Sequence, residues 1–207
     1  QARGRPPCPA ARAFPCLASH ADRQEPNPPP TPTSLEAMKL VVTAFVTVDG
    51  IVEAPGFDEH RSGRNAWALR VQNEEDQAYN KAQAMSADAF LLGRRTWQIW
   101  AAFWPTASGG DPELTDQMNR IAKYVVSNTL KRADWSNSTI ISGDVAAQVV
   151  KLKAQPGGDL MVFGSPDLVD ELLRQDLVDE YRLQVYPVIL GSGKRLFRDR
   201  IETHQLR

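Results

Sequence analysis

From residue 38 onward, short runs of apolar residues alternate with stretches in which apolar positions recur every three or four residues. The runs predict strands, and the periodic stretches predict amphipathic helices. Expected strands cover 40–48, 89–92, 124–127, 138–141, 160–163 and 180–190; expected helices cover 73–85, 96–103, a short stretch ending near 121, 145–154 and 166–174. This alternation predicts an α/β fold with a mostly parallel central sheet and helices on both faces.

The first 37 residues follow neither period. They contain nine prolines and lack the apolar stretch that a signal peptide requires. Because proline interrupts helices and strands alike, residues 1–37 are expected to form a disordered, proline-rich extension. Met38 stands directly before the first apolar run and looks like a natural start, so one folded domain is expected over residues 38–207.

Composition and charge exclude several classes of function. A formal net charge of -1 gives no basic footprint for nucleic acid, and no window approaches the length of a membrane span. The cysteines, Cys8 and Cys16, both lie in the extension, and His20, His60 and His204 are far apart in sequence. These spacings predict neither a disulfide framework nor a metal site in the domain. We therefore expect a cytoplasmic protein that binds a small molecule.

The segment "AFLLGRRTW" carries the first candidate chemistry. An apolar strand ends there on Gly93, and Arg94 and Thr96 follow at once. Glycine is expected to let the chain turn sharply, and Thr96 is expected to begin the next helix. In open α/β sheets, ligands bind at the carboxyl ends of the strands, where arginine, a hydroxyl and free helix N–H groups suit a phosphate.

Two more strands are expected to end on small polar residues. "KYVVSNTL" ends on Ser127 and Asn128, and "LMVFGSPDLVDELL" ends on Gly164 and Ser165. Ser165 is expected to cap the following helix, with Pro166 at its first position. Taken alone, the first motif indicates only a turn, and the second is explained equally well by a capped helix or by a ligand site. Three such strand ends at one edge of a parallel sheet favour a single ligand crevice.

Three other motifs give weaker evidence for a ligand site. "GSGK" at 191–194 lacks both the third glycine of a dinucleotide fingerprint and the Ser or Thr of a P-loop, which favours a glycine turn. Asp49 and Gly50 read as a turn after the first strand, although a carboxylate there could hold a substrate ring or relay a proton. The helical spacing of four aromatic residues favours a core face over a ring-stacking pocket: Trp97, Trp100, Phe103 and Trp104.

The order of these motifs resembles the dihydrofolate reductase-like superfamily, most closely the branch similar to the reductase domain at the C-terminus of the riboflavin-biosynthesis protein RibD. The resemblance rests on "LVVTAFVTVDGIVEAPG", "LLGRRTW", "KYVVSNTL", "DLMVFGSPDLVDELL" and "LVDEYRLQVYPVILGSGKRLF". It implies a homodimeric reductase that transfers a hydride from NADPH to a pterin-like or aminopyrimidine-like small molecule.

The resemblance also implies roles for individual residues. Those expected to bind NADPH are Gly93, Arg94 and Thr96 at the 2′-phosphate and pyrophosphate, Ser127 and Asn128 beside the adenosine phosphate, Gly164 and Ser165 over the pyrophosphate, and Ala44 beside the nicotinamide. Asp49 is the expected catalytic residue.

The chain departs from the family pattern in three places. Gly164 and Ser165 stand where dihydrofolate reductases have two glycines, as in the RibD-like branch, so an altered backbone is expected there. The carboxylate that binds the pterin in dihydrofolate reductases has no unique counterpart among Glu74, Glu75 and Asp76. The family also continues beyond the position of Arg207 into further strand, so a truncated sheet is expected. Two alternatives to the enzyme remain: a nucleotide-binding dimeric module of the same fold without turnover, and a structural role for the dimer.

Overall fold

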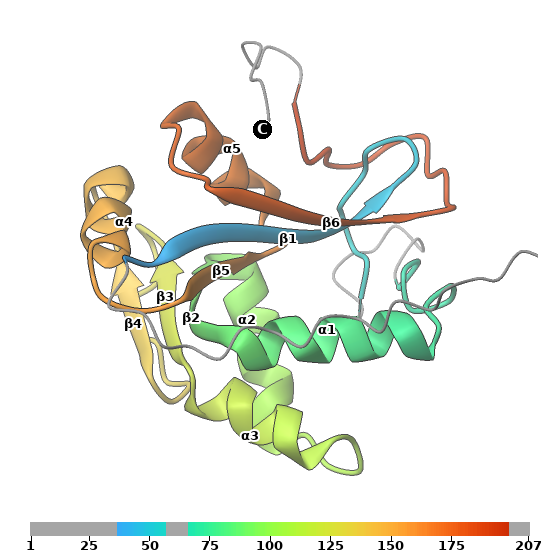
Figure 1. Cartoon of the computed structure of the whole chain (residues 1–207), viewed down its shortest axis with the longest axis horizontal. Coiled ribbons are helices and arrows are strands. Elements are labelled where there is room, and N and C mark those ends of the chain that lie inside the picture. Colours follow the sequence, from blue (N-terminus) through green and yellow to red (C-terminus); the bar gives the residue numbers. More distant parts are fainter. Residues whose placement is uncertain (1–36, 57–65, 199–207) are drawn as a thin grey trace, which may run out of the picture.

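The computed structural model describes residues 37–56 and 66–198 and forms a three-layer α/β domain (Figure 1). Its strands are β1 (Lys39–Thr47), β2 (Ala87–Gly93), β3 (Ala122–Val126), β4 (Ser138–Ile141), β5 (Asp159–Phe163) and β6 (Glu180–Tyr186). They form one sheet in the order β4-β3-β2-β5-β1-β6, and every pairing is parallel. The predicted fold class is confirmed, and all the carboxyl ends of the strands meet at one edge of the sheet.

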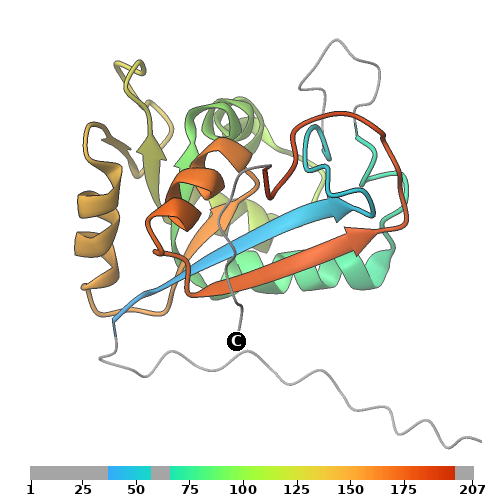
Figure 2. The ribbon, with the colours of Figure 1, turned by 90° about the horizontal axis from the view of Figure 1, so that it is seen from above.

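The helices are α1 (Glu74–Ser86), α2 (Arg94–Phe103), a 3-10 turn η1 (Trp104–Thr106), α3 (Pro112–Arg120), α4 (Val145–Lys153) and α5 (Pro166–Arg174). Helices α4 and α5 cover one face of the sheet, and α1, α2 and α3 cover the other (Figures 1 and 2). None of the helices within 37–56 and 66–198 is long and apolar enough to cross a membrane.

Each face of the sheet has its own apolar core. Alternate strand residues such as Leu40 and Leu91 pack with Leu172 of α5 on one face. Their neighbours, such as Phe90 and Met161, pack on the other face with residues that include Trp97 of α2. Strands buried on both faces read as nearly continuous apolar runs, which explains why the sequence located them correctly.

Two expected elements have different limits. The strand expected over 180–190 ends at Tyr186, because its partner β1 ends at Thr47 and Pro187 has no N–H to donate to the ladder. Helix α2 begins at Arg94, so Thr96 is its third residue. Of the expected extension, only residue 37 is described; it pairs with Pro156 in an isolated antiparallel bridge. Residues 1–36 and 199–207, on which the expectations of disorder and truncation bear, lie outside the described residues.

Candidate functional site

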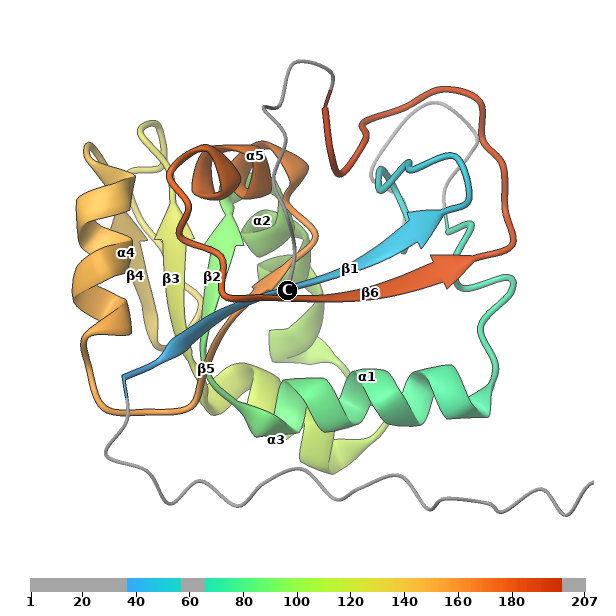
Figure 3. The same cartoon turned by 45° about the horizontal axis from the view of Figure 1, so that its top comes forward.

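A cavity of about 840 Å³ opens at the carboxyl edge of the sheet and is lined by residues of β1, β2 and β5 and of α1, α2 and α5. Figure 3 shows how these strands and helices are arranged. Six of the residues predicted from sequence line the cavity: Ala44, Gly93, Arg94, Thr96, Gly164 and Ser165. We call the part around these residues the cofactor end. The part between α1 and the second half of α2, which Phe45 also lines, is the substrate end.

Gly93 and Ser165 make a close contact across the cofactor end. The Gly93 amide donates to Ser165 Oγ at 3.1 Å, and a Cβ on residue 93 would lie only 2.9 Å from that oxygen. The φ angle of Gly93 is −68°, which any residue adopts, so the expectation that glycine permits a sharp turn is wrong here. A side chain at 93 would have to displace Ser165, because the Ser165 side chain lies so close to the Gly93 backbone.

Ser165 joins the two strand ends through its side chain. Its φ of 55° and ψ of 58° are left-handed, a conformation that costs about 1–3 kcal/mol for a residue other than glycine. Its hydroxyl does not cap α5, contrary to the sequence prediction; it is hydrogen-bonded to the Thr96 hydroxyl at 2.8 Å and accepts from Gly93. Two predicted phosphate-binding motifs therefore form one hydrogen-bonded unit.

The helices at the cofactor end lack side-chain caps. Asn73, Asp111 and Asp144 cap α1, α3 and α4 with their side chains, whereas the N-cap residues Gly93 of α2 and Ser165 of α5 make no such bond. An uncapped helix N-terminus presents backbone N–H groups and the positive end of the helix dipole to a ligand. Both uncapped termini lie at the cavity, because β2 and β5 are neighbours in the sheet.

Arg94 and Arg95 add positive charge to this end. Both line the cavity and both are exposed. Neither forms an ion pair or hydrogen bond through its side chain with any residue in the described part of the chain. Two guanidinium groups without carboxylate partners beside two uncapped helix termini make this end suited to an anion.

Ser127 and Asn128 lie beside this cavity rather than in it. The Ser127 hydroxyl accepts from the amides of Thr129 and Leu130, and Asn128 Oδ1 accepts from Gly143 N at 3.1 Å. Asn128 lines a second cavity of about 700 Å³ at the N-terminus of α4. The two cavities share two lining residues, Val145 and Glu171, so the predicted adenosine side adjoins the cofactor end.

Asp49 lies away from the residues that line the main cavity and binds the segment after β6, which we call the clasp (187–198). Its carboxylate accepts from the amides of Leu190 at 3.3 Å and Gly191 at 2.7 Å and from the Thr47 hydroxyl at 2.6 Å. The Thr47 hydroxyl, and after it these amides, hold the pKa of Asp49 below its ordinary value. These contacts hold the clasp against the loop that follows β1.

The clasp contains the "GSGK" segment, and both of its glycines have positive φ angles. Gly193 has a φ of 139°, and a Cβ there would lie 2.8 Å from Ile51. The prediction of a glycine turn thus agrees with the structure. Lys194 lines the cavity and pairs with Asp167 of α5 at 2.6 Å. The bond from Lys194, followed by that from Arg198, lowers the pKa of Asp167.

The aromatic residues of α2 divide between the core and the cavity. Trp97 is buried and donates through Nε1 to Ser138 Oγ, as the predicted core face requires. Trp100, Phe103 and Trp104 line the cavity. Trp100 and Trp104 also pack against the core, so the core interpretation holds for Trp97 and in part for these two, and Phe103 is exposed.

None of the three acidic candidates on α1 lines the cavity. Glu74 and Glu75 are exposed, and Asp76 accepts from the Asn73 amide in a capping box. The side chains of α1 that do line the cavity are Gln77, Asn80, Lys81 and Ala84. These residues are three, four and seven positions apart, which is the spacing of one helix face. Most of them are polar, so the apolar periodicity that predicted the helix did not indicate this face.

Lys81 is the charged residue that α1 brings to the substrate end. It pairs with Asp111 at 2.7 Å and with Glu113 at 2.6 Å, both near the start of α3. The hydrogen bond to Asp111, and then that to Glu113, raises the pKa of Lys81. The described residues contain no group of three or more His, Cys, Asp or Glu that could hold a metal ion.

Comparison with known proteins agrees with this architecture. The chain is 29% identical over 168 residues to the uncharacterized protein YyaP of Bacillus subtilis, covering 80% of this chain and 84% of that one. A putative riboflavin biosynthesis protein from Shewanella sp. PV-4 has the same fold, with a TM-score of 0.60, 20% identity, and coverage of 80% of this chain and 86% of that one. Dihydrofolate reductase from Enterococcus faecalis, complexed with NADP(H) and RAB-propyl, gives a TM-score of 0.50 at 14% identity over 78% and 77% of the two chains. The family model of the RibD C-terminal domain matches residues 38–207, and the chain belongs to that family.

Proposed function

We propose that this protein is an NADPH-dependent reductase of a small heterocycle, pterin-like or aminopyrimidine-like. One observation carries the proposal: the uncapped N-termini of α2 and α5 lie at the same end of the cavity as Arg94 and Arg95. Neither arginine has a side-chain partner among the residues that the structure describes. A dinucleotide pyrophosphate needs N–H donors, and a 2′-phosphate needs a cation. The dihydrofolate reductase with this fold that is complexed with NADP(H) supports the same assignment.

The residues at the cofactor end fit a dinucleotide. A Cβ at Gly164 would meet no atom within 4 Å, so the backbone there is open to a ligand, and its φ of 54° favours glycine. In the proposed complex the amides that begin α5 bind the pyrophosphate, and Arg94 pairs with the 2′-phosphate. NADPH, once bound, supplies the hydride; Ala44 and Phe45 at the end of β1 exclude water from the transfer site.

In this proposal the substrate binds in the substrate end of the cavity. Trp100 and Phe163 line the cavity with aromatic rings, and their ring centroids are 5.2 Å apart. A catalytic role for Asp49 stays a prediction, and the contacts of its carboxylate favour a positioning role instead. In that role it holds the clasp that carries Lys194 to the cavity. Asp49→Asn would then raise the KM for NADPH and leave the pH dependence of kcat unchanged; loss of the acid limb of the kcat profile would assign proton transfer to Asp49.

The test of the reductase is the absorbance of reduced nicotinamide in the presence of pterin and aminopyrimidine substrates. Oxidation of NADPH that depends on one of these substrates would support the enzyme. Tight NADPH binding without oxidation would favour the nucleotide-binding module, and the absence of nucleotide binding would leave the structural role.

We further propose that the protein forms a homodimer through β6. This strand is at the edge of the sheet, and exposed apolar side chains lie on or beside it: Val48, Val185 and Ile189. An apolar edge strand is normally covered, and a two-fold axis covers both copies at once. Light scattering at micromolar concentration should give twice the monomer mass; a monomer would exclude this interface.

A further inference from the structure

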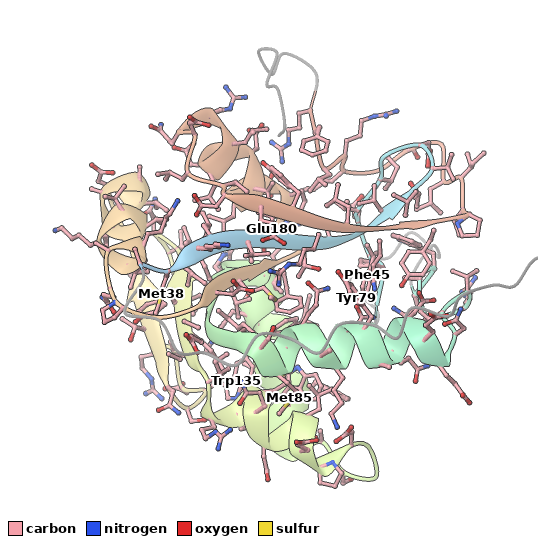
Figure 4. The ribbon with its side chains drawn as sticks, viewed as in Figure 1. Met38, Phe45, Tyr79, Met85, Trp135 and Glu180 are labelled. Atoms are coloured by element: carbon pink, nitrogen blue, oxygen red, sulfur yellow. The ribbon has the colours of Figure 1, made fainter. Side chains whose placement is uncertain are left out.

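Thr43 is a polar residue in the middle of the apolar strand β1. It is only 3% exposed, and it lines the cavity. Its neighbours Val42 and Ala44 belong to the core on the face of the sheet that α4 and α5 cover, so the Thr43 side chain faces α1. Phe45, two residues further along, faces the same way and lies between β1 and α1 (Figure 4). Thr43 therefore brings a hydroxyl to the cavity next to Ala44, which borders the proposed transfer site.

Gln83 of α1 fixes the direction of this hydroxyl. Its Nε2 donates to Thr43 Oγ1 at 3.2 Å. An oxygen that accepts from Gln83 directs its own proton elsewhere, and no acceptor within 37–56 and 66–198 takes up the proton of Thr43. Thr43 thus keeps one O–H donor for a ligand in the cavity.

Gln83 is buried at a cost to stability. Its side chain is almost wholly covered, and Gln83 Oε1 has no hydrogen-bond partner among the described residues. A buried amide oxygen without a donor is unfavourable, so an apolar side chain of similar volume would suit this position better. Gln117 of α3 is buried as well, but its amide is satisfied. It donates to the carbonyls of Ala84 and Ala87 and accepts from Arg120. A residue that breaks the rule of buried polar groups is expected where function requires it.

We propose that Thr43 donates a hydrogen bond to an acceptor atom of the substrate, and that Gln83 is the positioning residue that directs this donor. The inference rests on the proposed reductase function, in which the acceptor is the nitrogen or oxygen of the C=N or C=O bond that is reduced. As the carbon of that bond takes the hydride from NADPH, the electron pair collects on the nitrogen or oxygen. The Thr43 hydroxyl stabilises this charge without giving up its proton. Solvent water supplies the proton that completes the reduction, and NADP⁺ remains.

Two substitutions of Thr43 test the donor itself. Thr43→Val removes the hydroxyl and keeps the branched shape, whereas Thr43→Ser keeps the hydroxyl. The probe is 6-methylpterin, whose ring nitrogens and carbonyl oxygen are acceptors and whose own fluorescence reports binding without turnover. Thr43→Val should bind it roughly tenfold more weakly than wild type, and Thr43→Ser should stay within about threefold of wild type. Equal affinities of wild type and Thr43→Val, or no binding to wild type, would overturn the proposal.

Substitution of Gln83 separates positioning from packing. Gln83→Met removes both the unpaired Oε1 and the N–H that directs Thr43, so the thermal midpoint should stay the same or rise while the affinity for 6-methylpterin falls about threefold or more. The matched control Gln117→Met loses satisfied hydrogen bonds, and should lower the midpoint by roughly 4 °C or more without changing the affinity. A lower midpoint with unchanged affinity in Gln83→Met would assign Gln83 to packing and contradict the proposal. If both quantities fall in Gln83→Met, the two Thr43 variants decide, because they leave Gln83 in place.

Assays of NADPH oxidation on the same variants separate this inference from the reductase proposal. In an active enzyme, Thr43→Val should lower kcat more than it raises KM, because the hydrogen bond strengthens as charge develops on the acceptor atom. An active enzyme with unchanged kcat and KM in Thr43→Val would remove only the role of Thr43. Binding of 6-methylpterin that depends on the hydroxyl, without any NADPH oxidation, would remove only the reductase.

Discussion

The two edges of the sheet hold their cations in opposite ways. Near the amino edge, Lys123 of β3 is fully buried, and its ammonium donates to the carbonyls of Ile121, Ser136 and Asn119 at 2.8, 3.1 and 3.2 Å. It also lies 4.2 Å from the centroid of the Trp135 ring. At the carboxyl edge, Arg94 is exposed and has no side-chain partner among the residues described.

The difference separates a structural charge from one that is available to a ligand. Lys123 ties the end of α3 to the segment before β4, and its donors are used by backbone carbonyls. Burial lowers the pKa of Lys123 from its ordinary value of 10.5 to about 8. Arg94 keeps its hydration and its donors until an anion arrives. Positive charge alone does not mark a site; an unsatisfied cation beside open backbone donors does.

The largest expected effect is a loss of stability on substitution of Lys123, near the amino edge of the sheet. Lys123→Met keeps much of the apolar stem but leaves three backbone carbonyls without their donor, so the free energy of unfolding should fall by about 3 kcal/mol. Lys151→Met, at an exposed position in the last turn of α4, should change it by less than about 0.5 kcal/mol. Urea denaturation measures both. Equal stabilities would show that the buried ammonium is not a structural element.

The stability of the wild-type protein should also depend on pH through Lys123. Below pH 8 the amine is protonated in both states, so the penalty for burying the ammonium is fully present. Between about pH 8 and 10.5 the unfolded chain binds more protons, so the free energy of unfolding rises with pH relative to Lys123→Met. Denaturation series across this window should show the difference growing. A difference that shrinks would contradict the lowered pKa.

The next largest effects are expected on stability and NADPH binding at the carboxyl edge of the sheet. Gly93→Ala forces Ser165 away from its position, because the new Cβ would lie 2.9 Å from Ser165 Oγ. We expect a loss of about 1–3 kcal/mol in stability, with weakened NADPH binding. Gly164→Ala meets no atom within 4 Å and should cost only about 1–2 kcal/mol, from its left-handed φ. Thermal unfolding and NADPH titration of both variants test this; intact NADPH affinity in Gly93→Ala would separate the Gly93–Ser165 contact from cofactor binding.

The smallest effect on NADPH affinity is expected from substitution of Arg95, which lines the cavity but has no phosphate assigned to it in the proposed complex. Arg95→Ala removes an exposed charge, whose long-range contribution is screened by salt, so NADPH affinity should fall by less than about threefold. A loss as large as that expected for Arg94 would mean that the two arginines share the phosphate, or that Arg95 is the primary contact. Isothermal titration at two salt concentrations distinguishes screening from a direct pair.

Much of the fold and part of the site could be predicted from sequence. Parallel strands bring their carboxyl ends to one edge, so motifs ending on Gly93 and Gly164 were expected together, and both line the cavity. The contact between Asp49 and the clasp could not be predicted from sequence, because its amide partner Leu190 lies 141 residues further along the chain. The contact between Gln72, which lines the cavity before α1, and Tyr186 of β6 could not be predicted, because 114 residues separate the two and local periodicity does not encode it.

The central claim is that the carboxyl edge holds a charge reserved for the 2′-phosphate of NADPH. A charge-assisted pair to that phosphate is worth about 1.5–3 kcal/mol. Titrating NADPH and NADH against wild type and Arg94→Ala tests it most directly. We expect the variant to lose roughly ten- to a hundred-fold in affinity for NADPH and almost none for NADH. Equal losses for both nucleotides, or no loss for either, would contradict it.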